Sequence, residues 1–178
     1  MHEFLCVKET NHMSDAELLA AFVALFEPLY DEEAPAACKQ TTDISALERL
    51  YRRLPAKFPQ LYEQLVLSYR WQKSDVREGF LLLPNPHGGD LTGLADAIFR
   101  DKGMYSEMLP SGFIQFGCRA AYDYDPICFH TGNCTSLDYP IVVLDHEEIL
   151  CNWRIKIVDT IASSFREFVE AIVQGTQK

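Results

Sequence analysis

Four short apolar segments follow one another in the second half of the chain, and they limit its possible folds more than any other feature. Their sequences are FIQFGC (113–118), PICFHT (126–131), PIVVLD (140–145) and RIKIVDT (154–160). Runs of this length, with Asp, Asn, Gly or Pro in the connections, are typical of β-strands. The connections are short, whereas parallel strands need long crossovers. The pattern therefore predicts consecutive antiparallel strands.

One of these segments is apolar at every position. Residues Ile141, Val142, Val143 and Leu144 are all apolar, so this strand should be covered on both faces and should lie near the centre of the sheet. A fifth short apolar run, GFLLLP (79–84), is bounded by Gly and Pro and is also expected to be a strand.

Helix signals precede and follow these strands. Ser14 and Glu17 form a capping box, and Ser164 and Glu167 form another before a closing amphipathic helix. Further helices are expected after Asp43, after Pro59 and after Asp90, with Gly103 at the end of the last. Helices, then consecutive strands, then one helix give an α+β fold: an antiparallel sheet of about four to six strands backed by helices, in a single domain over residues 1–178.

Composition and charge limit the kinds of partner that the chain can bind and the compartment in which we expect it. The chain has 178 residues and a formal net charge of −10, which argues against nucleic-acid binding and favours a basic protein partner. The apolar run 18–26 is too short to span a membrane and lacks the flanks of an export signal, so we expect a cytoplasmic protein. The six cysteines form no Cys-x-x-Cys pair, so we expect free thiols and no zinc site or cofactor.

Several strings resemble the SUKH superfamily, which includes the Smi/Knr cell-wall assembly regulators. They are ALERLYRRLPAKFPQLYEQLV, FIQFGCRAAYDYDPICFHT, YPIVVLDHEE and IASSFREFVEAI, and they occur in the family's order within residues 43–174. Residues 1–42 form an N-terminal helical extension without a counterpart. The resemblance implies an α+β domain that binds proteins, and bacterial members of this type are immunity proteins that neutralise a toxin, often a nuclease.

The second half of the chain contains candidate residues for two kinds of chemistry. Cys128, His130, Asp145 and His146 could serve a small hydrolase, if they converge in a cleft. Asp123, Asp125, His130 and Cys134 could bind a metal, but they mix hard and soft donors at no recognised spacing. The favoured interpretation is neither: an acidic, aromatic turn that runs into a strand.

Exposed aromatic residues are the better candidates for a site. Tyr122, Asp123, Tyr124 and Asp125 combine two rings with two carboxylates in the turn, and Trp71 lies at the end of an expected helix. Tyr and Trp are preferred anchors of protein interfaces. We therefore expect a non-enzymatic protein-binding module, most simply an immunity protein, with these five residues at the interface. A hydrolase and a regulatory scaffold unrelated to toxins are the alternatives.

Overall fold

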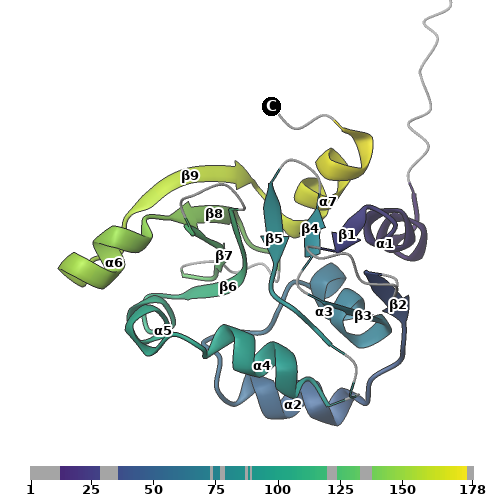
Figure 1. Ribbon diagram of the computed structural model, residues 1–178, viewed down its shortest axis with the longest axis horizontal. Coiled ribbons are helices and arrows are strands. Elements are labelled where there is room, and N and C mark those ends of the chain that lie inside the picture. The colour runs from purple at the N-terminus through teal and green to yellow at the C-terminus, as the bar shows by residue number, and fades with distance from the viewer. Residues whose placement is uncertain are drawn as a thin grey trace, which may run out of the picture.

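The computed structural model describes residues 13–28, 36–72, 74–76, 79–86, 88, 90–119, 124–132 and 138–175. A seven-stranded antiparallel sheet organises this part of the chain (Figure 1). In spatial order its strands are β1 (Phe26–Pro28), β4 (Ser74–Val76), β5 (Phe80–Leu82), β6 (Phe113–Arg119), β7 (Pro126–His130), β8 (Ile141–Leu144) and β9 (Ile157–Ala162). A second, two-stranded sheet pairs β2 (Ala37–Lys39) with β3 (Tyr69–Trp71).

The predicted α+β class and antiparallel sheet are confirmed. The large sheet has more strands than the four to six that we expected. The additional strands, β1 and β4, have three residues each, which is too short to show a periodic pattern in the sequence.

Seven helices accompany the sheets in the described part of the chain. They are α1 (Asp15–Val23), α2 (Ile44–Tyr51), α3 (Gln60–Ser68), α4 (Thr92–Ile98), α5 (Lys102–Met108), α6 (His146–Asn152) and α7 (Phe165–Gln174). The caps predicted for α1, α2 and α7 are confirmed, because Ser14, Asp43 and Ser164 each accept a hydrogen bond from a backbone N–H of the first turn.

Other helix boundaries differ from the prediction. The helix expected after Pro59 ends at Ser68, and the residues that follow it form β3. Gly103 does not end a helix: it lies in the first turn of α5, where its N–H donates to the Asp101 carboxylate. Both differences arise where a short element begins directly after a helix.

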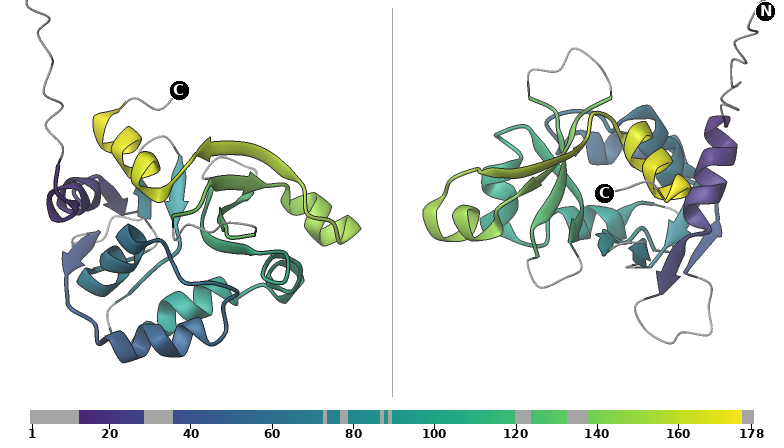
Figure 2. Two further views of the ribbon diagram at one scale, coloured as in Figure 1. Left: turned by 180° about the vertical axis from the view of Figure 1, so that it is seen from behind. Right: turned by 90° about the horizontal axis from the view of Figure 1, so that it is seen from above.

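Helices cover both faces of the sheet, but unequally (Figures 1 and 2). Ile141 and Val143 of β8 belong to the large core, together with residues of α1, α2, α3, α4 and α7. Val142 and Leu144 belong to a smaller cluster with residues of α5 and α6. The strand is therefore buried on both faces, as predicted. The expectation that it lies at the centre is wrong, since it is next to the edge strand β9.

Aromatic rings join the helices to the middle of the sheet. Phe116 of β6 and Phe129 of β7 stack with their ring centroids 4.3 Å apart. Tyr62 of α3 and Phe165 of α7 contact Phe129 edge-on, at 5.0 Å and 5.7 Å. This cluster fixes β6 and β7, and so fixes the base of the hairpin that they form.

The first helix belongs to the same core. Leu18, Leu19 and Phe22 of α1 are buried in the large cluster, and the rings of Phe22 and Phe165 meet edge-on. Arg166 of α7 also forms an ion pair with Asp15 of α1. Helix α1 of the N-terminal extension is thus packed against the closing helix.

Gly117 provides a test of the sheet geometry. A Cβ at this position would lie 2.8 Å from the Leu81 carbonyl oxygen of β5, closer than van der Waals contact allows. Gly117→Ala must push two paired strands apart, so it should lower the free energy of unfolding by about 1–3 kcal/mol in urea denaturation. Gly103→Ala is the matched control, because its Cβ would meet a movable Leu150 side chain at 3.1 Å. Equal stability of the two variants would contradict this packing.

Among the described residues, no helix combines the length and the apolar character that a membrane span requires.

Candidate functional site

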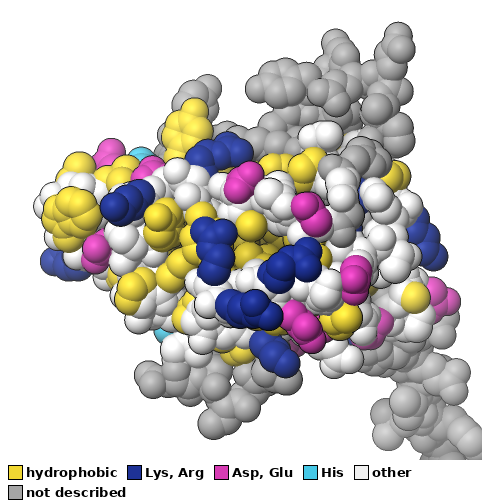
Figure 3. All heavy atoms as spheres, turned by 90° about the horizontal axis from the view of Figure 1, so that it is seen from below, with side chains coloured by type: hydrophobic (Ala, Val, Ile, Leu, Met, Phe, Trp, Pro, Cys, Tyr) yellow, Lys and Arg dark blue, Asp and Glu magenta, His cyan; other side chains and the backbone are white. Residues whose placement is uncertain are grey.

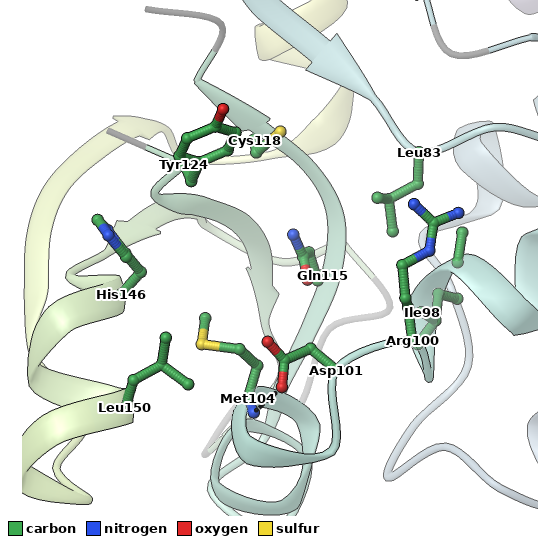
Figure 4. A pocket seen from close by; sticks show the side chains of 11 residues that line it. Leu83, Ile98, Arg100, Asp101, Met104, Gln115, Cys118, Tyr124, His146 and Leu150 are labelled. Carbon is green, nitrogen blue, oxygen red and sulfur yellow. Dashed lines mark hydrogen bonds between the residues drawn. The ribbon is translucent and has the colours of Figure 1, made fainter. Parts of the chain in front are cut away.

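A hollow of about 250 Å³ opens between the helices of the smaller cluster and the end of the β6–β7 hairpin (Figure 4). Its floor is the β6 strand, which contributes Gln115 and Cys118. Its walls come from α4, α5 and α6 and from Tyr124 just before β7. The lining residues are Leu83, Ala97, Ile98, Arg100, Asp101, Met104, Gln115, Cys118, Tyr124, His146 and Leu150.

An Asp125–His146 pair closes one side of this hollow. The Asp125 carboxylate accepts a hydrogen bond from the His146 backbone N–H at 3.0 Å, and its Oδ1 lies 2.8 Å from His146 Nδ1. The Asp125 side chain is 14% exposed. Asp125, which we expected in an acidic turn at an interface, therefore holds the start of α6 against the hairpin.

This role gives a stability prediction. Asp125→Ala removes the acceptor for a part-buried N–H, so we expect the free energy of unfolding to fall by about 1–3 kcal/mol. Asp96→Ala, an exposed carboxylate on α4, is the control and should change stability by less than about 0.5 kcal/mol. Urea denaturation measures both. If Asp125→Ala were as stable as Asp96→Ala, the pair would not secure the hairpin.

The predicted interface residues lie in different environments. Tyr124 is 72% exposed, in a left-handed backbone conformation with φ of 47°, and its ring stands at the mouth of the hollow (Figure 4). Tyr122 and Asp123 lie outside the described residues. Trp71 is 2% exposed, and its indole N–H donates to the Leu83 carbonyl oxygen at 2.9 Å. Trp71 is therefore a core residue, and the prediction that it contacts a partner does not fit this structure.

Further apolar side chains are exposed on α6, at its C-terminal cap and along β9. Leu150 lines the hollow with Tyr124, and Trp153, Ile157 and Val158 follow along the chain, with Trp153 64% exposed. We call these five residues, Tyr124, Leu150, Trp153, Ile157 and Val158, the arm surface. They include most of the large hydrophobic side chains that are exposed in the described part of the chain.

The backbone of α6 presents the Trp153 ring to solvent. Trp153 caps the helix in a left-handed conformation, and its N–H donates to the carbonyls of Glu148 and Ile149. It is thus held by hydrogen bonds while its ring stays free. Trp153 was not among the predicted site residues, although a Trp in the connection between two expected strands was a usable signal.

Three ion pairs lie around the arm surface, and Glu147 of α6 is an exposed carboxylate that takes part in none of them. Lys156 bonds Asp145, Arg154 bonds Glu148 and Arg119 bonds Asp159, with N–O distances of 2.8–2.9 Å. Hydrogen bonds from Lys156 and from the Glu148 N–H hold the pKa of Asp145 below its usual value. Asp145 also caps α6, so the DHEE sequence is the start of a helix and not a turn. Local neutralisation leaves apolar contact as the main property of this surface.

Strand β9 is an edge of the sheet with irregular pairing. Its pairing with β8 is interrupted by two register shifts. Such bulges bend an edge strand and discourage the addition of another strand.

The residues proposed for a hydrolase have separate surroundings. Cys128 is fully buried in the smaller cluster, and burial raises the pKa of its thiol, which disfavours the nucleophilic thiolate. His130 stacks on Phe113 with centroids 4.5 Å apart, whereas His146 bonds Asp125 and Asp145 bonds Lys156. This arrangement offers no activated cysteine at Cys128.

Two of the four candidate metal ligands, Asp123 and Cys134, lie outside the described residues. Of the residues that the structure describes, no three His, Cys, Asp or Glu side chains are grouped so that they could hold a metal ion. Cys128 and Cys151 are free thiols.

Comparison with known proteins adds no relative. No family model matches the chain, and no curated protein is significantly similar to it. The resemblance to the SUKH superfamily therefore stays a prediction from the quoted strings.

Proposed function

We propose that this chain is a non-enzymatic protein-binding module, and that its partner contacts the arm surface. The observation that carries the proposal is the exposure of five large apolar side chains at the hairpin end and along the consecutive elements α6 and β9, led by Tyr124 and Trp153. Exposed rings beside a hollow are typical of interface anchors, because they bury a large area at a small cost in conformational entropy.

The resemblance to the SUKH superfamily suggests which kind of protein-binding module this is, namely an immunity protein. An immunity protein acts by covering a toxin in the cytoplasm, and many toxins are basic because their substrate is nucleic acid. The net charge of −10 favours the approach of such a partner over long distances. Apolar contacts at the arm surface then slow its release.

The test has a biochemical and a cellular part. The tagged protein is used to capture partners from its native host, and each captured protein is then expressed in a sensitive host. We expect a basic protein that arrests growth alone and does not arrest growth when this chain is co-expressed. Capture of no stoichiometric partner, or a growth arrest that co-expression leaves unchanged, would contradict the immunity role.

A further inference from the structure

Buried polar side chains gather at the C-terminal end of helix α3. In the described part of the chain four polar or charged residues are buried, and three of them, Thr42, Arg70 and Asn85, lie around this helix end. Strand β3 continues from the helix, and β2 pairs with β3 beside it (Figure 1). Arg70 is 1% exposed. A buried arginine is unusual, because its guanidinium stays charged in proteins and loses its hydration on burial.

One part of the Arg70 guanidinium has a structural task. Arg70 Nη1 donates to the carbonyl oxygens of Val66 and Tyr69 at 2.7 Å and 2.8 Å. Asn85 Nδ2 donates to the same two oxygens at 3.1 Å and 2.9 Å. These bonds satisfy a carbonyl of the last turn of α3 that has no acceptor role within the helix. The shared acceptors also place the ends of the Arg70 and Asn85 side chains next to each other.

The helix end requires nothing more from Arg70. Backbone N–H groups satisfy the other three carbonyls of the last turn, through the bonds Tyr69 to Leu65, Thr42 to Leu67 and Gln40 to Ser68. All four carbonyls that a helix leaves unpaired at its C-terminus are therefore bound.

The other edge of the guanidinium is buried without such a task. Arg70 Nε and Nη2 have no acceptor among the described residues, and Asn85 Oδ1 has no donor there. Nε–H and Nη2–H are parallel, and such a pair binds a carboxylate or a phosphate through two hydrogen bonds. Two donors and one acceptor that are buried side by side favour a ligand that both accepts and donates.

The charge of Arg70 is not balanced by a carboxylate. Among the described residues no carboxylate forms an ion pair with it. Burial lowers the pKa of Arg70, and this effect outweighs the opposite effects of Cys38 and Asp90. Asp90 is exposed, and its carboxylate accepts hydrogen bonds from the N–H and the hydroxyl of Thr92. The C-terminal end of a helix supplies only about half a negative charge.

The exposed cations of the chain are in a different situation. On the face seen from below, Lys and Arg side chains are interspersed with Asp and Glu side chains (Figure 3). Exposed charges of this kind stay hydrated and need no fixed counterion. Burial without a carboxylate therefore distinguishes Arg70 from the cations on that face.

We propose that Arg70 and Asn85 bind a small oxyanion that carries a hydrogen, of the class of hydrogen phosphate and bicarbonate. Two oxygens of the anion accept from Arg70 Nε and Nη2, and its O–H donates to Asn85 Oδ1. A water molecule could make these hydrogen bonds, but it would not supply the negative charge that a buried cation requires. The inference is independent of the arm surface.

The surroundings of the site limit its ligand to a small ion. The three atoms that would bind it are buried, so a peptide or a nucleic acid could not reach them. Strands β2 and β3 have three residues each, and a two-stranded sheet of this length opens easily. Local opening of β2 can therefore admit the ion, and the bound ion should in turn stabilise this part of the fold.

The experiment is equilibrium dialysis of the full chain against radiolabelled inorganic phosphate, with chloride keeping the ionic strength constant. The wild-type protein should bind phosphate stoichiometrically, and Arg70→Met should not bind it. Arg52→Met is the matched control: it removes the same charge from an exposed position on α2 and should bind as the wild type does. Sulfate has no hydrogen to donate to Asn85 Oδ1, so it should bind about tenfold or more weakly than phosphate.

Arg70→Lys keeps the experiment decisive if Arg70→Met fails to fold. Lysine retains the charge and can still reach a carbonyl, but it lacks the two parallel N–H groups, so phosphate affinity should fall about tenfold or more. Three results would overturn the proposal. They are no binding of phosphate or bicarbonate to the wild-type protein, equal phosphate affinity of Arg70→Lys and the wild type, and equal affinity for sulfate and phosphate.

Discussion

Val143→Asp is expected to abolish folding. Val143 is fully buried in β8, between β7 and β9, and belongs to the large core. An unpaired carboxylate there loses its hydration without gaining a partner, which costs several kcal/mol. A domain of this size has a total stability of about 5–15 kcal/mol. The variant should be insoluble, or should lack a cooperative thermal transition in circular dichroism.

Val158→Asp is the matched control. Val158 lies on the next strand, β9, and is 42% exposed, so its new carboxylate stays hydrated. This variant should be soluble and should melt within a few degrees of the wild-type protein. Cooperative melting of Val143→Asp at a similar temperature would show that β8 is not a core strand.

The second large effect concerns the partner that is captured. Trp153→Ala removes the large exposed ring at the C-terminal cap of α6. The loss should weaken binding of the partner by about 2 kcal/mol or more. That corresponds to roughly a thirtyfold change in Kd. Because apolar anchors act after the encounter, the change should appear in the dissociation rate, with little effect on the association rate or its salt dependence. Surface plasmon resonance at two salt concentrations separates these quantities.

Ile44→Ala serves as the control for Trp153→Ala. Ile44 is 56% exposed on α2, outside the arm surface, and its truncation should leave both rates unchanged. Equal effects of the two variants, or none from Trp153→Ala, would place the interface elsewhere.

The sequence predicted the larger strands and the capped helices because each carries a local signal. Strands β6, β7, β8 and β9 appear as apolar runs, and Ser14, Asp43 and Ser164 are caps whose hydrogen bonds are local. The run GFLLLP likewise predicted β5. The three-residue strands β1, β2, β3 and β4 carry no such signal, since β1 pairs with β4 and β2 with β3 across long stretches of chain. Strand β8 was predicted at the centre of the sheet because it is apolar on both faces. Its outer face is instead buried by α5 and α6, and neither helix was expected.

The candidate site was predicted only in part. The hairpin before β7 does present an exposed ring, Tyr124. The role of Asp125 could not be predicted, because its partner His146 is 21 residues away and no periodic pattern links them. Trp71 was misplaced because the expected helix ended at a ring that instead joins β3 to the core.

Amide hydrogen exchange with and without the captured partner tests the central claim most directly. The partner should slow exchange in α6 and β9, over residues 146–162, and around Tyr124, because contacts there exclude water and suppress local opening. Exchange in α1, on the far side of the molecule, should not change (Figure 1). Protection that spares residues 146–162 while the partner is fully bound would contradict the proposed arm surface.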